Sequence, residues 1–130
     1  MVGVQIDETG SSIQIIGAEK FNLEDTFECG QCFRWDKMGS KYHCVVHGFE
    51  IWVYYKGKNL VIEGDFPEKI NDLWIEYFDL NLDYSKIRRD LSAIDPTLHK
   101  ACKFCPGIRI LRQEPWETLC SFIISQNNNI

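Results

Sequence analysis

The spacing of apolar residues changes near Gly64, and this change constrains the fold more than any other feature of the 130-residue chain. Before Gly64, short β-branched and aromatic runs alternate with polar residues, a pattern that is typical of strands. After it, apolar residues recur at helical spacing. A strand-rich part followed by a helical part predicts an α+β fold.

The strand-rich part is expected to form an antiparallel meander with glycine-bearing turns. The expected strands are residues 13–16, 33–35, 42–46, 49–55 and 60–62. Alternate residues of the longest run share one face by the two-residue period and are predicted to face the core: Phe49, Ile51, Val53 and Tyr55.

The first expected helix carries an apolar stripe that runs from Ile70 to Phe78. Asp65 and Glu68 match the spacing of a capping box in front of it. A second helix is expected to begin near Asp83.

A third helix is expected to open at Asp95, an N-cap that Pro96 follows in the first turn, and to end at Pro106. A fourth opens at Pro115 and carries a strongly apolar stripe: Trp116, Leu119, Cys120, Ile123 and Ile124. Because the chain ends soon after this helix, we expect a partner helix beyond it and a truncated chain. Without that partner, Ile123 and Ile124 should be exposed, and we expect self-association or a disordered end.

The net charge of −5 is unevenly distributed. Residues 1–83 hold 7 Lys and Arg against 15 Asp and Glu, whereas residues 84–130 hold 7 against 4. This basic last third, which includes Arg109, permits phosphate binding but does not demonstrate it. No apolar run approaches the roughly 20 residues that span a bilayer, and no secretory signal is visible. We expect an intracellular chain with reduced cysteines and no membrane partner.

Two CxxC pairs, Cys29 with Cys32 and Cys102 with Cys105, raise the alternative of a zinc-stabilised binding module without enzymatic activity. Their separation is longer than a compact zinc ribbon uses. Cys102 and Cys105 also complete an apolar helical stripe, so we interpret them as small core residues and expect neither a metal nor a cofactor.

Gly30 and the run Asn127, Asn128 and Asn129 are the other candidates for a site. From the residues alone, Gly30 is either an ordinary turn glycine or a point where the backbone approaches a ligand closely. One asparagine of the run is accounted for as a helix C-cap, and the other amides suit unpaired base edges and phosphate oxygens.

Three blocks together, GQCFRW at 30–35, GIRILRQEP at 107–115 and SFIISQNNNI at 121–130, resemble the 8-oxoguanine DNA glycosylases of the helix-hairpin-helix superfamily. The similarity covers about residues 20–130. It implies an antiparallel sheet like that of the TATA-box-binding protein, with flanking helices, in residues 1–94. Residues 95–130 would begin the helical helix-hairpin-helix domain.

The resemblance also implies a function in base excision repair, with duplex DNA containing 8-oxoguanine opposite cytosine as the partner. The enzyme would flip the oxidised guanine out of the helix and break its glycosidic bond through a lysine, assisted by an aspartate. Both catalytic residues would lie beyond residue 130, in a missing carboxyl-terminal portion, so the chain alone is expected to be inactive.

Two positions match residues with known roles in that family. The main-chain carbonyl of Gly30 would accept a hydrogen bond from N7–H of the lesion, and Asn127 would fill the gap left by the flipped base. Asn128 and Asn129 would support that turn. The paired cysteines depart from the family pattern, which keeps the zinc alternative open.

Overall fold

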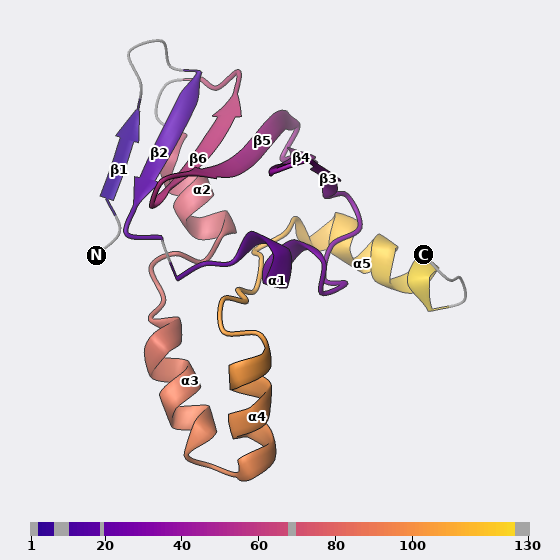
Figure 1. The fold of residues 1–130 in the computed structure, drawn as a ribbon. Helices are drawn as coiled ribbons and strands as arrows, with labels where there is room; N and C mark the ends of the chain where they lie inside the picture. The colour runs from indigo at the N-terminus through magenta and orange to yellow at the C-terminus, as the bar shows by residue number, and fades with distance from the viewer. Residues whose placement is uncertain (1–2, 7–10, 19, 68–69, 127–130) are drawn as a thin grey trace.

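The computed structural model describes residues 3–6, 11–18, 20–67 and 70–126, and Figure 1 shows their arrangement. Within these residues the strands form one antiparallel sheet in the order β1-β2-β6-β5-β4-β3. The strands are β1 (Gly3–Ile6), β2 (Ser12–Ile16), β3 (Asp36–Met38), β4 (Lys41–Val46), β5 (Phe49–Lys56) and β6 (Asn59–Gly64). The predicted α+β fold, an antiparallel sheet with flanking helices, is confirmed.

The strands β4, β5 and β6 lie where the alternation of the sequence predicts them. A two-residue turn at His47 and Gly48 joins β4 to β5, with Val46 paired to Phe49. Ile51 and Val53 are fully buried, and Phe49 and Tyr55 pack against the same core. The predicted apolar face of β5 is therefore confirmed.

The predicted strand at residues 33–35 is wrong. These residues form an irregular loop, and β3 begins at Asp36. Trp35 stacks on Phe27 with ring centroids 3.9 Å apart, while Arg34 reaches Glu117. Arg34 and Trp35 therefore contact different parts of the fold. These tertiary contacts, and not the alternation of apolar and polar residues, determine the conformation of the segment.

The helices are α1 (Leu23–Phe27), α2 (Asn71–Tyr77), α3 (Tyr84–Ser92), α4 (Pro96–Phe104) and α5 (Pro115–Ser125). The predicted N-cap of α4 at Asp95 and the predicted helix start near Asp83 are confirmed, because each aspartate accepts hydrogen bonds from two main-chain N–H groups of the first turn that follows it. The short helix α1 was not expected.

The predicted capping box at Asp65 and Glu68 is wrong. Helix α2 begins only at Asn71, and its N-cap residue makes no side-chain hydrogen bond to the helix. The segment before it instead brings the ring of Phe66 against Phe49 and Trp74. Glu68 itself lies outside the described residues.

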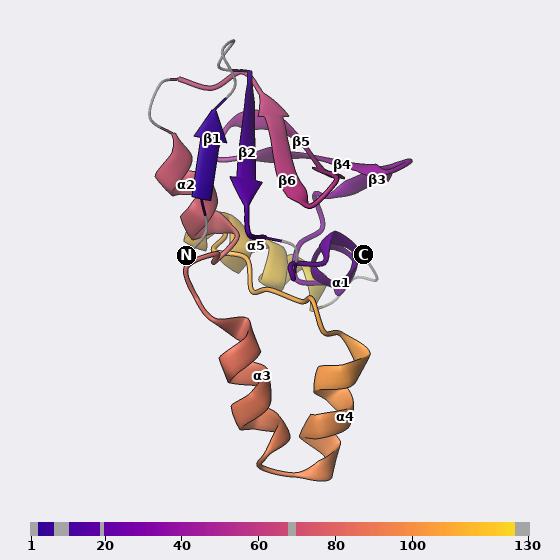
Figure 2. The same cartoon turned by 60° about the vertical axis from the view of Figure 1, so that its left-hand side comes forward.

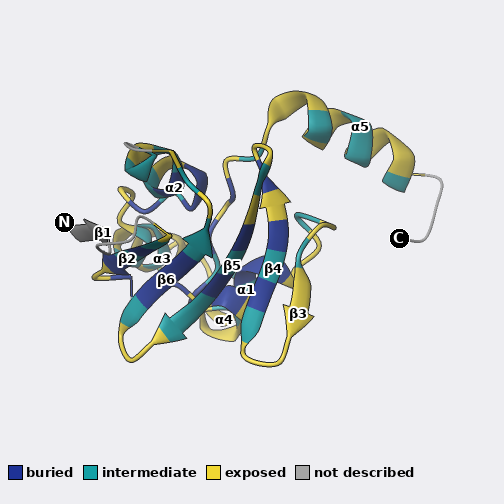
Figure 3. Cartoon of the chain, turned by 90° about the horizontal axis from the view of Figure 1, so that it is seen from above, coloured by how far each residue is buried: buried dark blue, intermediate teal, exposed yellow. Residues whose placement is uncertain are grey.

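The core lies between the sheet and the first two helices. An aromatic cluster joins α1 and α2 there, with the rings of Phe21, Phe27 and Phe78 in mutual contact and Trp74 fully buried. In Figure 3 the buried residues gather on β4, β5, β6, α1 and α2, whereas α5 shows only intermediate and exposed residues.

Helices α3 and α4 form a hairpin that extends away from the sheet, and α5 extends from the body in another direction (Figures 1 and 2). None of α3, α4 and α5 contains a buried residue. No helix in the described part of the chain is long and apolar enough to cross a membrane. The expected domain boundary between residues 94 and 95 falls inside the hairpin and stays a prediction.

Candidate functional site

Gly30 lies in the loop between α1 and β3, in a backbone conformation that favours glycine. Its φ is +84°, and a Cβ atom added there would meet nothing within 4 Å. Packing therefore does not require a glycine at this position, but the backbone conformation does. Gly30 is exposed, and its peptide carries no side chain of its own.

This peptide lies at the wall of a pocket of about 230 Å³. Residues 30–34 and Gln113 form one wall, and one face of α5 forms the other. That face is mostly polar, with one aromatic ring: Glu117, Thr118, Ser121, Phe122 and Ser125. The structure thus brings the first and third sequence blocks together across more than 80 residues of chain.

An ion pair connects the two walls of the pocket. Arg34 Nη1 donates to Glu117 Oε1 at 2.6 Å, and this hydrogen bond raises the pKa of Arg34. The two side chains are 47% and 44% exposed, so the pair adds little to stability. Its consequence is geometric, because it ties the loop of Gly30 to the first turn of α5. Sequence reasoning missed both residues.

The second sequence block runs along α1 and positions α5. Gly107 N donates to Asp25 Oδ2 at 3.0 Å, and Arg109 N donates to Thr26 Oγ1 at 3.1 Å. A Cβ at Gly107 would lie 2.2 Å from that of Asn22, so only glycine permits this close approach.

Arg109 is a structural cation and not part of a phosphate-binding surface. Its side chain is buried at 8% exposure, and Nη1 donates to the Asp79 carbonyl oxygen at 2.6 Å. Its guanidinium also lies 4.6 Å from the ring centroid of Tyr84. Burial lowers the pKa of Arg109. The basic last third of the sequence therefore contributes one less charge to the surface than its composition indicates.

We expect Arg109→Met to lower the free energy of unfolding by about 2–4 kcal/mol, because it removes a cation–π contact and a 2.6 Å hydrogen bond to the Asp79 carbonyl oxygen, which keeps only a 3.4 Å bond from Leu82 N. Denaturant titration measures this loss. The matched control is Arg112→Met, because the Arg112–Asp79 pair is 3.4 Å long and its arginine is mostly exposed. We expect that control to lose less than about 1 kcal/mol. Equal losses would contradict the structural role of Arg109.

The paired cysteines do not form the zinc site of the alternative hypothesis. Within the described residues, no three or more His, Cys, Asp or Glu side chains are placed to hold a metal ion. Cys102 and Cys105 are half-buried and lie outside the core cluster, so their interpretation as core residues is wrong. The reason is that α4 has no buried residue.

Burial raises the pKa of Cys44, a core cysteine that belongs to neither pair and was not singled out from the sequence, to about 12.

Asn127, Asn128 and Asn129 lie outside the described residues. Helix α5 ends at Ser125, and Gln126 is its C-cap. The predicted roles of the three asparagines therefore stay predictions.

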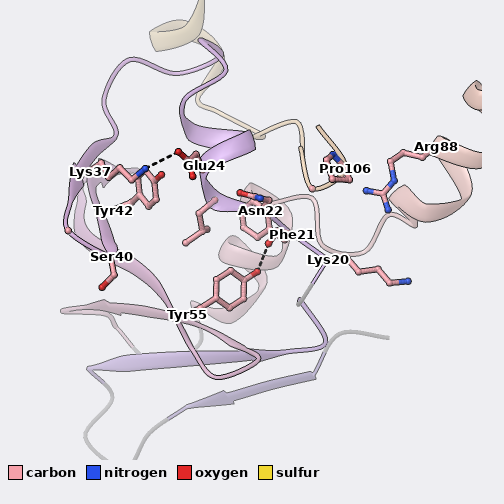
Figure 4. A pocket seen from close by; sticks show the side chains of 13 residues that line it. Lys20, Phe21, Asn22, Glu24, Lys37, Ser40, Tyr42, Tyr55, Arg88 and Pro106 are labelled. Atoms are coloured by element: carbon pink, nitrogen blue, oxygen red, sulfur yellow. Dashed lines mark hydrogen bonds and ion pairs between the residues drawn. The ribbon is translucent and has the colours of Figure 1, made fainter. Parts of the chain in front are cut away.

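A second pocket, of about 520 Å³, is lined by residues of α1 and does not include Gly30. Figure 4 shows the side chains that line it. Several of its polar groups already have protein partners. Lys37 Nζ contacts Glu24 Oε1 at 3.1 Å, and the Tyr55 hydroxyl donates to the Phe21 carbonyl oxygen at 2.6 Å. We therefore favour the smaller pocket at Gly30 as the candidate site, since its wall includes an exposed glycine with a positive φ.

Comparison with known proteins identifies relatives along most of the chain. Residues 13–119 match the family model described as 8-oxoguanine DNA glycosylase, N-terminal domain. The N-glycosylase/DNA lyase OGG1 of Arabidopsis thaliana is 26% identical over 117 residues, which are 85% of this chain and 32% of that protein. The N-glycosylase/DNA lyase of Saccharomyces cerevisiae is 83% identical over 24 residues, 18% of this chain and 6% of that protein.

Solved structures of similar proteins share the fold. MBOgg1 in complex with a low-affinity DNA ligand has a TM-score of 0.90 and 43% identity, covering 99% of this chain and 44% of that one. The Clostridium acetobutylicum 8-oxoguanine glycosylase/lyase, bound to double-stranded DNA with cytosine opposite 8-oxoG, has a TM-score of 0.86 and 41% identity. It covers 99% of this chain and 43% of that one. The chain thus spans about a third to under a half of the length of these relatives, the short yeast match aside.

Proposed function

Because this chain belongs to the family of 8-oxoguanine DNA glycosylase N-terminal domains, we propose that it is the lesion-recognition part of an enzyme that excises oxidised guanine from duplex DNA. The observation that carries the proposal is the pocket between the Gly30 loop and α5. A glycosylase must accept a base that has been flipped out of the helix, because the bond to be broken cannot be reached inside the stack.

The chemistry of the lesion fits a main-chain carbonyl as its reader. 8-Oxoguanine has a proton on N7, where guanine has a lone pair. The Gly30 carbonyl oxygen would accept a hydrogen bond from the first and face a lone pair in the second. A mispaired buried polar group costs about 1–3 kcal/mol. The exposure of Gly30 and the open space at its Cβ position support this role.

We place the catalytic lysine and aspartate outside these 130 residues, since the chain covers less than half of the solved relatives. The remaining portion of the enzyme would then be an obligate partner, and the 130 residues alone would not excise the base. Asn127 would fill the space of the flipped base, with Asn128 and Asn129 supporting it.

The proposed partner is duplex DNA with 8-oxoguanine opposite cytosine, the DNA named for the Clostridium structure. The proposal requires neither a metal nor a cofactor. Because its substrate would be DNA, the protein would be intracellular. We also propose that residues 1–94 form one domain and that residues 95–130 begin the next.

The test is an excision assay with the complete gene product on three duplexes, containing 8-oxoguanine, guanine or an alkylated base, each opposite cytosine. We expect strand products from the first duplex alone. Activity on the alkylated base with none on 8-oxoguanine would refute the proposal. The 130-residue chain in the same assay is expected to give no product.

A further inference from the structure

The side chain of Gln31, which follows Gly30, is held by three main-chain groups. Its Nε2 donates to the carbonyl oxygens of Thr26 and Arg109, each at 2.8 Å, and its Oε1 accepts from Leu111 N at 2.9 Å. These bonds use both amide donors and the acceptor. Exchanging the amide nitrogen and oxygen would set Oε1 against two carbonyl oxygens, so the contacts permit one orientation.

The main chain of Gln31 is held as well. Its carbonyl oxygen accepts a hydrogen bond from Gln113 Nε2 at 2.7 Å, although the two residues are 82 positions apart. We call Gln31 and Gln113 together the amide latch. The latch ties the loop after α1 to the segment that leads into α5, and both contribute to the wall of the pocket that faces α5.

Gly30 has no side chain of its own that could hold its peptide in place. Glycine rotates more freely than other residues, and no atom lies within 4 Å of the position where its Cβ would be. The Gly30 carbonyl and the Gln31 nitrogen belong to one planar peptide unit. Holding Gln31 by its side chain and by its own carbonyl therefore limits the directions in which the Gly30 carbonyl can point.

We propose that Gln31 is a positioning residue for lesion recognition, through which the amide latch fixes the direction of the Gly30 carbonyl. This inference rests on the proposed function, in which that carbonyl reads N7 of the base. An acceptor that is fixed before binding distinguishes a donor from a lone pair, whereas an acceptor that can rotate away relieves the mismatch with guanine. Discrimination between the two bases then depends on a side chain that does not itself contact the base.

The decisive variant is Gln31→Glu, because it keeps the shape of the side chain and changes its hydrogen bonds. An ionised carboxylate would face the carbonyl oxygens of Thr26 and Arg109, and protonation would restore one donor. In the complete gene product, we expect the ratio of the dissociation constants for guanine and 8-oxoguanine duplexes to fall about tenfold or more at pH 8. Measured at about pH 5.5, the ratio should return towards that of the unchanged protein at the same pH.

Two further variants separate positioning from stability. Gln113→Ala removes only the bond to the Gln31 carbonyl, so we expect a smaller fall in the ratio that low pH does not reverse. Gln14→Glu is the matched control, because Gln14 lies on β2 and its Oε1 accepts from Asn59 Nδ2, a bond that a carboxylate also makes. It should leave the ratio unchanged. Thermal unfolding is followed for every variant.

The measured ratios decide whether Gln31 positions the Gly30 carbonyl or only stabilises the fold. If Gln31→Glu lowers stability but keeps the ratio of the unchanged protein at both pH values, the inference is overturned and Gln31 is only structural. If Gln31→Glu does not fold, an unchanged ratio in Gln113→Ala overturns it instead. If the unchanged protein does not distinguish the two duplexes, the proposed function has failed and not the role of Gln31.

Discussion

Gly30→Val is expected to weaken the binding of 8-oxoguanine duplex by the complete gene product about 100-fold, with little change in its affinity for undamaged DNA. A β-branched residue does not tolerate the φ of +84° at this position, so the peptide must rotate. Rotation turns the carbonyl that is proposed to read the lesion. Equilibrium binding to the two duplexes measures the effect, and single-turnover excision should fall in parallel.

Gly57→Val is the matched control for this variant. Gly57 also has a positive φ, +64°, and open space at its Cβ position, but it lies in the turn between β5 and β6, away from the pocket. Both variants should lose a similar free energy of unfolding, about 1–3 kcal/mol, because both strain a loop. Only Gly30→Val should lose lesion affinity. An equal loss of affinity in both would mean that the effect comes from stability, and the proposed role of Gly30 would fall.

Local patterns predicted the parts of the fold that local interactions determine. The alternation in β5 follows from burial of one face of a sheet, and the cap at Asp95 follows from a side chain that bonds its own first turn. Helix α1 was missed because its five residues are too few to show a helical period. The loop at residues 33–35 was misassigned because its conformation depends on Phe27 and Glu117.

In the candidate site, too, features that depend on distant contacts could not be predicted from the sequence. The sequence singled out Gly30 only through the family resemblance, because the residues alone also allow an ordinary turn glycine. It did not single out Gln31, Gln113 or Arg109, since each acts through a partner about 30 to 80 residues away. No rule of sequence spacing predicts that two glutamines so far apart in the chain share hydrogen bonds. Only the fold shows that both belong to one set of hydrogen bonds.

A polypeptide of these 130 residues is expected to self-associate through α5. Trp116, Leu119 and Ile123 lie on one stripe of the helix and are 70%, 49% and 57% exposed. This confirms the predicted exposure of Ile123, and contiguous apolar surface of this kind drives association. The double variant Leu119→Lys with Ile123→Lys should convert the chain to a monomer, because it places two charges where the copies would meet. Light scattering at several concentrations measures the mass.

The control keeps the number of charges and changes only where they lie. Met38 and Ile110 are 58% and 56% exposed but lie on β3 and in the segment before α5, outside the stripe. Replacing both by lysine should leave self-association intact, since isolated apolar residues on a surface do not drive it. Neither Leu119 nor Ile123 lines the pocket, so the α5 variant should leave the site unchanged. A monomeric unchanged chain, with α5 protected from hydrogen exchange, would contradict the expectation, because the stripe would then be covered within one copy.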